Sequence, residues 1–233
     1  MHTRQNALNK WLNDVVGHAF SLSPLAGDAS FRQYFRLQHQ NHSYVVMDAP
    51  PEKESVASFI NIAKRLTQHN VDIPKIYALD QSQGFVLLED LGDLLLLKAI
   101  HTDNLEKLYR QALVTLAKIQ SCPSQDLPVF NQTIILEELN LYHSWFLQHF
   151  LQLKLTSKEI DIVQSTFHWL AGQMMAQPQV FVHRDYHSRN LMVIDNSEDP
   201  RLAVIDFQDA VLGPCAYDLV SLLEDARRDV SVE

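Results

Sequence analysis

The sequence predicts an α+β protein in which a small antiparallel-sheet part precedes a mainly helical part. Three observations predict this order. The first ninety residues contain short segments rich in aromatic and β-branched residues. After Gly92 the apolar residues take up helical spacing, and short strand-like segments return between Val180 and Ile205. We therefore expect residues 1–92 to form the first part and residues 93–233 the second.

Four strands and one helix are expected in the first part. The strands are predicted at residues 31–38, 43–48, 75–80 and 85–89, and the turn HQNH joins the first two. Two prolines then precede a segment with the i, i+3, i+4 spacing of an amphipathic helix. Its apolar residues are Val56, Phe59, Ile60, Ala63 and Leu66.

The second part is expected to be helical, with a short hairpin near its end. Helices are predicted at residues 103–119, 134–153, 156–175 and 215–228. Thr156 and Glu159 have the spacing of a capping box at the start of the third of these. Strands are predicted at residues 180–182, 191–194 and 202–205, with the turn-rich NSEDP between the last two.

The composition excludes several classes of protein. The chain is 46% hydrophobic and 20% charged, as in ordinary globular proteins, and its net charge of −9 makes nucleic acid a poor partner. Its two cysteines form no C-x-x-C pair. The N-terminus lacks the apolar stretch of a signal peptide, and the apolar run 94–97 is too short to span a bilayer. We expect a cytoplasmic protein without a membrane or nucleic-acid partner.

The candidate catalytic and metal-binding residues lie in one segment, residues 183–206. It contains H-x-D-x-x-x-x-N at His183, Asp185 and Asn190, and then an apolar strand that ends in Asp206. Mg²⁺ prefers carboxylate, amide, phosphate and water oxygens, so Asn190 and Asp206 are candidate metal ligands. Asp185 is the candidate catalytic carboxylate that faces an acceptor hydroxyl. Taken singly, each of the three has an ordinary alternative as a turn or cap residue.

Two histidines of this segment have other interpretations. We expect His183 to brace the loop by hydrogen bonding and not to act as a base. His183 and His187 are four residues apart, which would suit zinc, but no third soft ligand lies in register. Further along, we expect Asp218 to cap a helix and to hold the catalytic loop.

The motif resembles the catalytic loop H-R-D-x-x-x-x-N of kinases, down to Arg184. Asp206-Phe207-Gln208 resembles the metal-binding D-F-G, with a residue other than Gly that is more usual in the aminoglycoside phosphotransferase-like branch. This resemblance implies a two-lobed protein-kinase-like fold with ATP and Mg²⁺ as cofactors. It also implies that Asp185 is the base and that Asn190 and Asp206 bind the metal.

The resemblance can be narrowed. GDASFRQYFR, VVMDAPPEKE, GFVLLEDLG and VIDFQDAVLGPCAYDL look similar to bacterial N-acetylmuramate/N-acetylglucosamine anomeric kinases. This implies transfer of phosphate from ATP to the C1 hydroxyl of one of these amino sugars in cell-wall recycling. Arg189, His187 and Arg32 are the candidate substrate contacts. Such kinases normally continue past the final helix with helices that help form the sugar pocket, whereas this sequence stops at Glu233.

The nucleotide side is expected at two places. Gly27, Asp28, Ser30 and Arg32 would occupy the phosphate-covering loop, although an ordinary hairpin turn is a serious alternative. Glu89 and Leu91 would offer backbone groups to an adenine ring. The strand at 44–48 lacks the lysine that a kinase would place there, and Arg32 or Lys53 are candidate replacements. Glu54 or Glu52 would be the helix carboxylate.

Two other functions stay open at this point. An aminoglycoside or other small-molecule phosphotransferase would suit the acidic net charge. A nucleotide-binding pseudokinase or regulatory protein would suit the missing lysine, but it need not keep Asp185, Asn190 and Asp206 together.

Overall fold

The computed structural model describes residues 2–25 and 31–226. The chain forms two compact units. The first contains Met1–Ala112 and Arg189–Gln208, and the second contains Leu113–Ser188 and Asp209–Glu233. The segment that includes Asn190 and Asp206 therefore belongs with the N-terminal residues. The predicted boundary after residue 92 stays a prediction.

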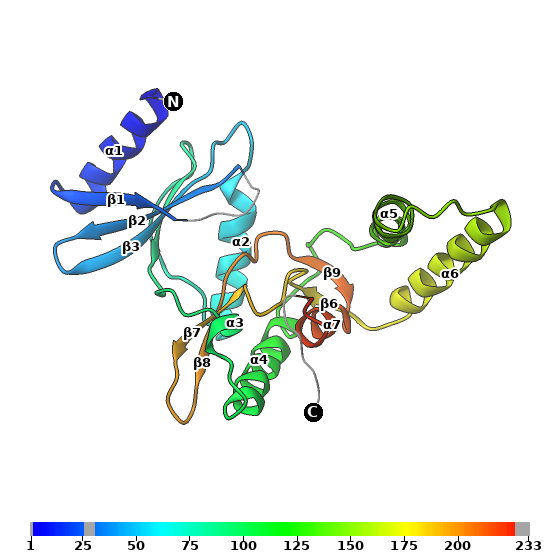
Figure 1. Cartoon of the computed structure of the whole chain (residues 1–233). Coiled ribbons are helices and arrows are strands. Elements are labelled where there is room, and N and C mark those ends of the chain that lie inside the picture. Colours follow the sequence, from blue (N-terminus) through cyan, green and yellow to red (C-terminus); the bar gives the residue numbers. More distant parts are fainter. Residues whose placement is uncertain (1, 26–30, 227–233) are drawn as a thin grey trace. The chain divides into compact units, whose positions relative to one another are not determined.

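The first unit is built on a five-stranded antiparallel sheet with the order β1-β2-β3-β5-β4. Its strands β1, β2 and β3 are labelled in Figure 1. Tight turns join β2 to β3 and β4 to β5, as the sequence predicts. The elements are α1 (His2–Val16), β1 (Phe20–Pro24), β2 (Gln33–His39), β3 (His42–Asp48), α2 (Val56–Gln68), β4 (Ile76–Asp80) and β5 (Phe85–Glu89).

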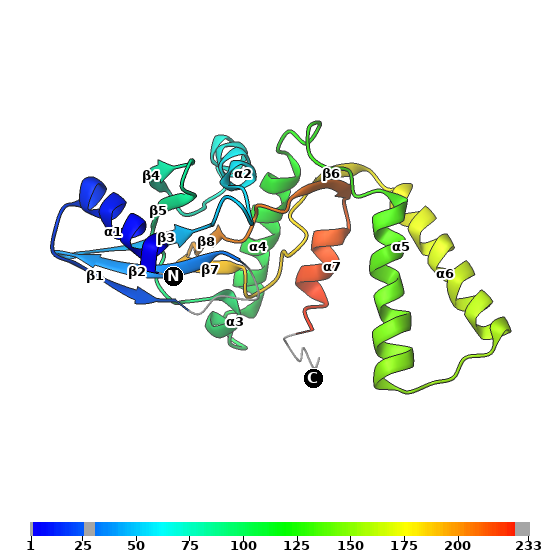
Figure 2. The ribbon, with the colours of Figure 1, turned by 90° about the horizontal axis from the view of Figure 1, so that it is seen from above.

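Helix α1 covers one face of this sheet (Figure 2). Its buried residues Leu8, Trp11 and Leu12 pack against side chains of β2, β3 and β5. The expectation that the first ninety residues are mainly strands therefore missed a helix of 15 residues. The i, i+3, i+4 spacing of these three residues is its signal.

A hairpin of two strands completes the first unit. Strands β7 (Leu191–Asp195) and β8 (Arg201–Val204) pair antiparallel, and Leu95 bridges to Met192 just before the short helix α3 (Leu96–Ala99). The backbone N–H of Val204 also donates to the carbonyl of Asp72. Helix α4 (Leu105–Gln120) contributes residues to both units.

The second unit combines helices with a two-stranded sheet. Its elements are α5 (Gln132–Leu141), the π-helix η1 (Tyr142–Phe150), α6 (Ser157–Met175), β6 (Gln179–Val182), β9 (Val211–Pro214) and α7 (Tyr217–Leu223). Helices α5 and α6 pack side by side. A buried cluster of this unit includes residues of both helices and consists of Phe130, Ile135, Ala171, Val182 and Val211.

Three predicted helices of the second unit have different outcomes. The capping box of α6 is present, with Thr156 and Glu159 bonded to each other's backbone N–H. The helix predicted over 134–153 changes into the π-helix after Leu141, where aromatic rings four residues apart stack on one another. The last helix ends at Leu223. In the described part of the chain, no helix is long and apolar enough to cross a membrane.

Candidate active site

The catalytic-loop motif of the second unit begins directly after β6. His183, Tyr186 and Ser188 are fully buried, whereas the side chain of Asp185 is exposed. Arg184, beside it, has a positive φ of 79°, which non-glycine residues rarely adopt. Strained backbone of this kind persists only where the surroundings hold it in place. The loop thus exposes the carboxylate of Asp185 next to residues that are fully buried.

Asp218 holds this loop through its backbone. The fully buried carboxylate of Asp218 accepts hydrogen bonds from the N–H of His183 at 2.7 Å and of Arg184 at 3.0 Å. Burial raises the pKa of Asp218 to about 7, and the two N–H donors oppose this rise. The sequence predicted that Asp218 holds the loop, and the structure confirms it. Its side chain serves the loop and not the cap of α7, whose N-cap residue is Ala216.

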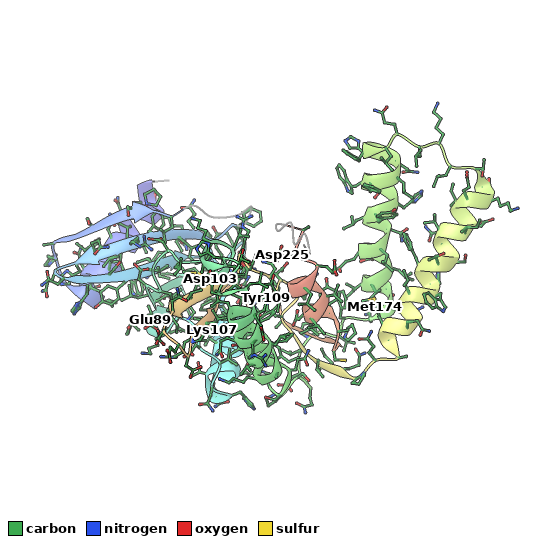
Figure 3. The ribbon with its side chains drawn as sticks, turned by 60° about the horizontal axis from the view of Figure 1, so that its bottom comes forward. Glu89, Asp103, Lys107, Tyr109, Met174 and Asp225 are labelled. Carbon is green, nitrogen blue, oxygen red and sulfur yellow. The ribbon has the colours of Figure 1, made fainter. Side chains whose placement is uncertain are left out.

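A second buried carboxylate holds the other end of the loop. Asp225 follows the last turn of α7 (Figure 3) and accepts hydrogen bonds from both the backbone N–H and the hydroxyl of Ser188. Asp225 was not predicted as a site residue, because the sequence pattern predicts a continuous helix over residues 215–228. The only signal was an acidic pair near the end of an apolar helix. Residues 227 and 228 of that predicted helix lie outside the described residues.

Arg184 is turned toward α5. Its guanidinium forms an ion pair with Glu138 at 2.7 Å, and the other oxygen of Glu138 accepts a hydrogen bond from the Tyr217 hydroxyl at 3.1 Å. Burial lowers the pKa of Arg184, but the bond to Glu138 outweighs this and raises it overall. Arg184 is therefore a structural cation that ties the loop to α5.

The predicted substrate residues differ in exposure. Arg189 is exposed, whereas His187 is buried and its backbone N–H donates to the carbonyl of Asp185 at 3.0 Å. The backbone of His187 thus tightens the turn beside Asp185. Among the described residues, no cluster of three or more His, Cys, Asp or Glu side chains could hold a metal ion, so the spacing of His183 and His187 gains no further zinc ligand.

The two predicted metal ligands come together in the first unit, at the open end of the β7–β8 hairpin. Asn190 precedes β7, Asp206 follows β8, and the N–H of Ile205 donates to the carbonyl of Asn190 at 3.0 Å. The amide of Asn190 lies 3.5 Å from Asp206 Oδ2. Asp206 is exposed and has a positive φ of 63°. One amide and one exposed carboxylate form a donor set that fits Mg²⁺, with phosphate and water oxygens as the remaining ligands.

The residues after Asp206 connect it to α2. The side-chain amide of Gln208 donates to Asp206 Oδ1 at 2.8 Å. The backbone carbonyl of Gln208 accepts a hydrogen bond from the hydroxyl of Ser58 at 2.6 Å. The rings of Phe207 and Phe59 stack with centroids 4.8 Å apart. The segment after β8 is thus attached to the first half of α2 by one hydrogen bond and one aromatic contact.

A buried cation stands near the strand position that lacks lysine. Met47 is fully buried opposite Tyr34, and the nearly buried Arg32 forms an ion pair with Glu54 at 2.8 Å. Arg32 also donates to the hydroxyl of Tyr34. Burial raises the pKa of Tyr34 to about 12, Arg32 opposes the rise, and the charge of Asp206 adds to it. Asp206 and Arg32 therefore both lie near Tyr34 in this unit.

The other residues predicted to bind the nucleotide lie in different surroundings or outside the described residues. Lys53 lies over the ring of Phe31 at 5.3 Å, and Glu52 is exposed. Gly27, Asp28 and Ser30 lie outside the described residues. The N–H of Leu25, just before them, donates to the carbonyl of Tyr34 at 2.8 Å.

The segment after β5 lines a cavity of about 360 Å³ in the first unit. Glu89 and Leu91 are among its lining residues, and the backbone N–H of Glu89 donates to the carbonyl of Lys75. Arg36 holds the same segment by ion pairs with Asp90 at 2.7 Å and Asp93 at 2.9 Å. Burial raises the pKa of Asp90, but Arg36 and Ser43 outweigh this and lower it overall.

Comparison with known proteins decides the family. The model of the phosphotransferase enzyme family matches residues 21–233. The chain belongs to this family. It is 37% identical to the N-acetylmuramate/N-acetylglucosamine kinase of Pseudomonas putida, over 96% of this chain and 68% of that protein. It is 39% identical to the kinase of the same name from Neisseria meningitidis serogroup B, over 96% of this chain and 67% of that protein.

Solved structures agree with this phosphotransferase fold. The choline kinase LicA from Streptococcus pneumoniae matches with a TM-score of 0.67 at 17% identity, over 99% of this chain and 77% of that one. The GDP and kanamycin complex of APH(2")-IIia matches with a TM-score of 0.68 at 19% identity, over 93% and 77%. The predicted α+β, protein-kinase-like fold class is confirmed.

Proposed function

We propose that this chain is a sugar kinase that transfers the γ-phosphoryl group of ATP to the C1 hydroxyl of N-acetylmuramate or N-acetylglucosamine. The observation that carries the proposal is the 37–39% identity, over 96% of the chain, to kinases named for these two sugars. The retained Asp185, Asn190 and Asp206 support chemistry over a purely regulatory role. The C1 position rests on the resemblance of the sequence motifs to anomeric kinases.

Asp185 is proposed to orient the acceptor hydroxyl and to take its proton. Its exposure supports this role, because a base must reach the proton that it accepts. The backbone clamps formed by Asp218 and Asp225 support it too, since a held loop keeps the carboxylate in one place. Asp185 and Asn190 are five positions apart in the sequence, so the chain keeps their Cα atoms within at most about 18 Å.

Asn190 and Asp206 are proposed to hold Mg²⁺. The ion, when bound, would bridge phosphate oxygens and neutralise the charge that develops during transfer. The exposed carboxylate of Asp206 and its approach to the Asn190 amide support this assignment. Asn190 would bind the ion through the oxygen of its side-chain amide, because the amide nitrogen is a hydrogen-bond donor and not a metal ligand.

The nucleotide is proposed to lie against the first unit. Arg32, placed by Glu54 and Tyr34, would supply the phosphate-binding cation that β3 lacks. Gly27, Asp28 and Ser30 would offer backbone N–H groups to the phosphates, and the segment Glu89–Leu91 would contact the base. Nucleotide complexes of related folds support this side of the proposal, since APH(2")-IIia binds GDP.

The sugar is proposed to meet Arg189 and His187. N-acetylmuramate carries a carboxylate, which a guanidinium binds well. Arg189 is exposed and supplies that cation, whereas the buried His187 would act by fixing the turn at Asp185.

The proposal is tested by release of ADP with N-acetylmuramate, N-acetylglucosamine and kanamycin as acceptors, each with and without Mg²⁺. We expect turnover with N-acetylmuramate or N-acetylglucosamine in the presence of Mg²⁺, and none with kanamycin or without Mg²⁺. Asp185→Ala should lower it by about 10²–10⁴-fold, the usual contribution of a general base. Asp161→Ala, an exposed carboxylate on α6, is the matched control and should leave turnover unchanged. Turnover with kanamycin alone, or equal rates in the wild type and Asp185→Ala, would overturn the proposal.

A further inference from the structure

Gln208 stands where the D-F-G sequence of protein kinases has glycine, and its contacts give it a task that glycine cannot perform. It is nearly buried, and its side-chain amide donates to Asp206 Oδ1. We infer that Gln208 is the positioning residue for the metal ligand Asp206 and couples that ligand to helix α2. This inference rests on the proposed function, because it assumes that Asp206 holds Mg²⁺.

A carboxylate on the surface rotates about its side-chain torsions, and ordering it on metal binding costs free energy. The amide of Gln208 fixes Oδ1 before any metal arrives. It leaves Oδ2 on the side of Asn190, which lies 3.5 Å away. A neutral amide also leaves the full negative charge on the carboxylate, whereas a lysine or arginine in its place would partly cancel the attraction for a cation.

Gln208 is itself held from behind. The Ser58 hydroxyl donates to its backbone carbonyl at 2.6 Å, and the Phe59–Phe207 stack fixes the preceding residue. Both partners lie in the first turn and a half of α2. The positive φ of Asp206 requires such support from neighbouring contacts. A shift of α2 would therefore move the carbonyl of Gln208 and, through its amide, the metal-binding carboxylate.

The deciding variant is Gln208→Met, which keeps an unbranched side chain of similar length and removes the donor. The measurement is ADP binding by calorimetry at rising Mg²⁺ concentration, which needs no sugar and no turnover. Loss of a contact that orients a metal ligand lowers metal affinity by about 10-fold or more. We therefore expect Gln208→Met to need about 10-fold more Mg²⁺ for the same gain in ADP affinity, with binding in the absence of Mg²⁺ unchanged.

Two further variants complete the test. Gln68→Met, at an exposed position on α2, should behave as the wild type. Ser58→Ala should shift the Mg²⁺ requirement in the same direction by a smaller factor, and the double variant should be no worse than Gln208→Met alone, because both act through one chain of contacts. If circular dichroism shows Gln208→Met to be unfolded, Ser58→Ala carries the test.

The outcomes distinguish a failure of the role of Gln208 from a failure of the metal site. Mg²⁺-dependent ADP binding that is the same in the wild type, Gln208→Met and Ser58→Ala overturns the role of Gln208 and leaves the kinase proposal standing. ADP binding that does not depend on Mg²⁺ in the wild type overturns the metal site itself, and the inference with it.

Discussion

The catalytic loop of the second unit and the metal-ligand segment of the first are held in different ways. The loop is held through its backbone, because Asp218 and Asp225 accept hydrogen bonds from the N–H groups of His183, Arg184 and Ser188. Asp206 is held through its side chain, by the amide of Gln208. Each segment contains one residue with a strained, positive φ, Arg184 in the loop and Asp206 in the other.

The difference teaches what each segment tolerates. Hydrogen bonds to backbone N–H groups do not depend on the identity of the side chains that carry those groups, here His183 and Arg184. A clamp on a side chain depends on the identity of its partner, so the metal segment needs Gln208 or an equivalent donor. We therefore expect changes in Asp218 to act mainly on stability, and changes in Gln208 to act mainly on the metal.

The largest stability effect is expected from Asp218→Ala. The change leaves two N–H groups of the catalytic loop without their acceptor, and each such loss costs about 1–3 kcal/mol. We expect the free energy of unfolding in urea to fall by about 2–5 kcal/mol at pH 7. Asp161→Ala should change it by less than about 0.5 kcal/mol, as surface substitutions usually do. A loss as small as that of the control would mean that the loop does not depend on this clamp.

A smaller effect of the same carboxylate should appear in the pH dependence of stability. Its pKa is raised from the ordinary value of 3.8 to about 7 in the folded protein. Between about pH 4 and 7 the folded state therefore binds a proton that the unfolded state does not. The contribution of this proton to stability is present below about pH 4 and is lost as the pH rises toward 7. Relative to Asp218→Asn, which does not titrate, the wild type should lose unfolding free energy over this window.

The pH dependence of the stability difference between the wild type and Asp218→Asn shows whether the clamp works as a charged or as a protonated carboxyl group. A difference between the wild type and Asp218→Asn that is flat from pH 4 to 7 would mean that the hydrogen bonds from His183 and Arg184 cancel the effect of burial. In that case the clamp would work as a charged group throughout.

Sequence patterns predicted those elements whose signals are local. The amphipathic spacing of α2, the capping box of α6 and the hairpin β7–β8 with Asn190 and Asp206 at its ends all follow from residues close in sequence. The loop-holding role of Asp218 came from its motif and is confirmed.

The missed features depend on contacts between residues far apart in sequence. Asp225 meets Ser188, and Ser58 meets the carbonyl of Gln208, across 37 and 150 residues respectively. No local spacing encodes such pairs. The π-helix η1 was missed for another reason, because its residues continue a helical pattern and differ only in how tightly the backbone winds.

Asp185 and Asp206 have separate tasks in the proposed reaction, the first at the acceptor hydroxyl and the second at the metal ion. The decisive measurement records both sugar-dependent ADP release and Mg²⁺-dependent ADP binding for Asp185→Asn and Asp206→Asn. We predict that Asp185→Asn loses turnover by about 10²-fold or more and keeps the Mg²⁺ dependence of ADP binding, whereas Asp206→Asn loses both. Undiminished turnover in Asp185→Asn, or unchanged Mg²⁺ dependence in Asp206→Asn, would contradict the account.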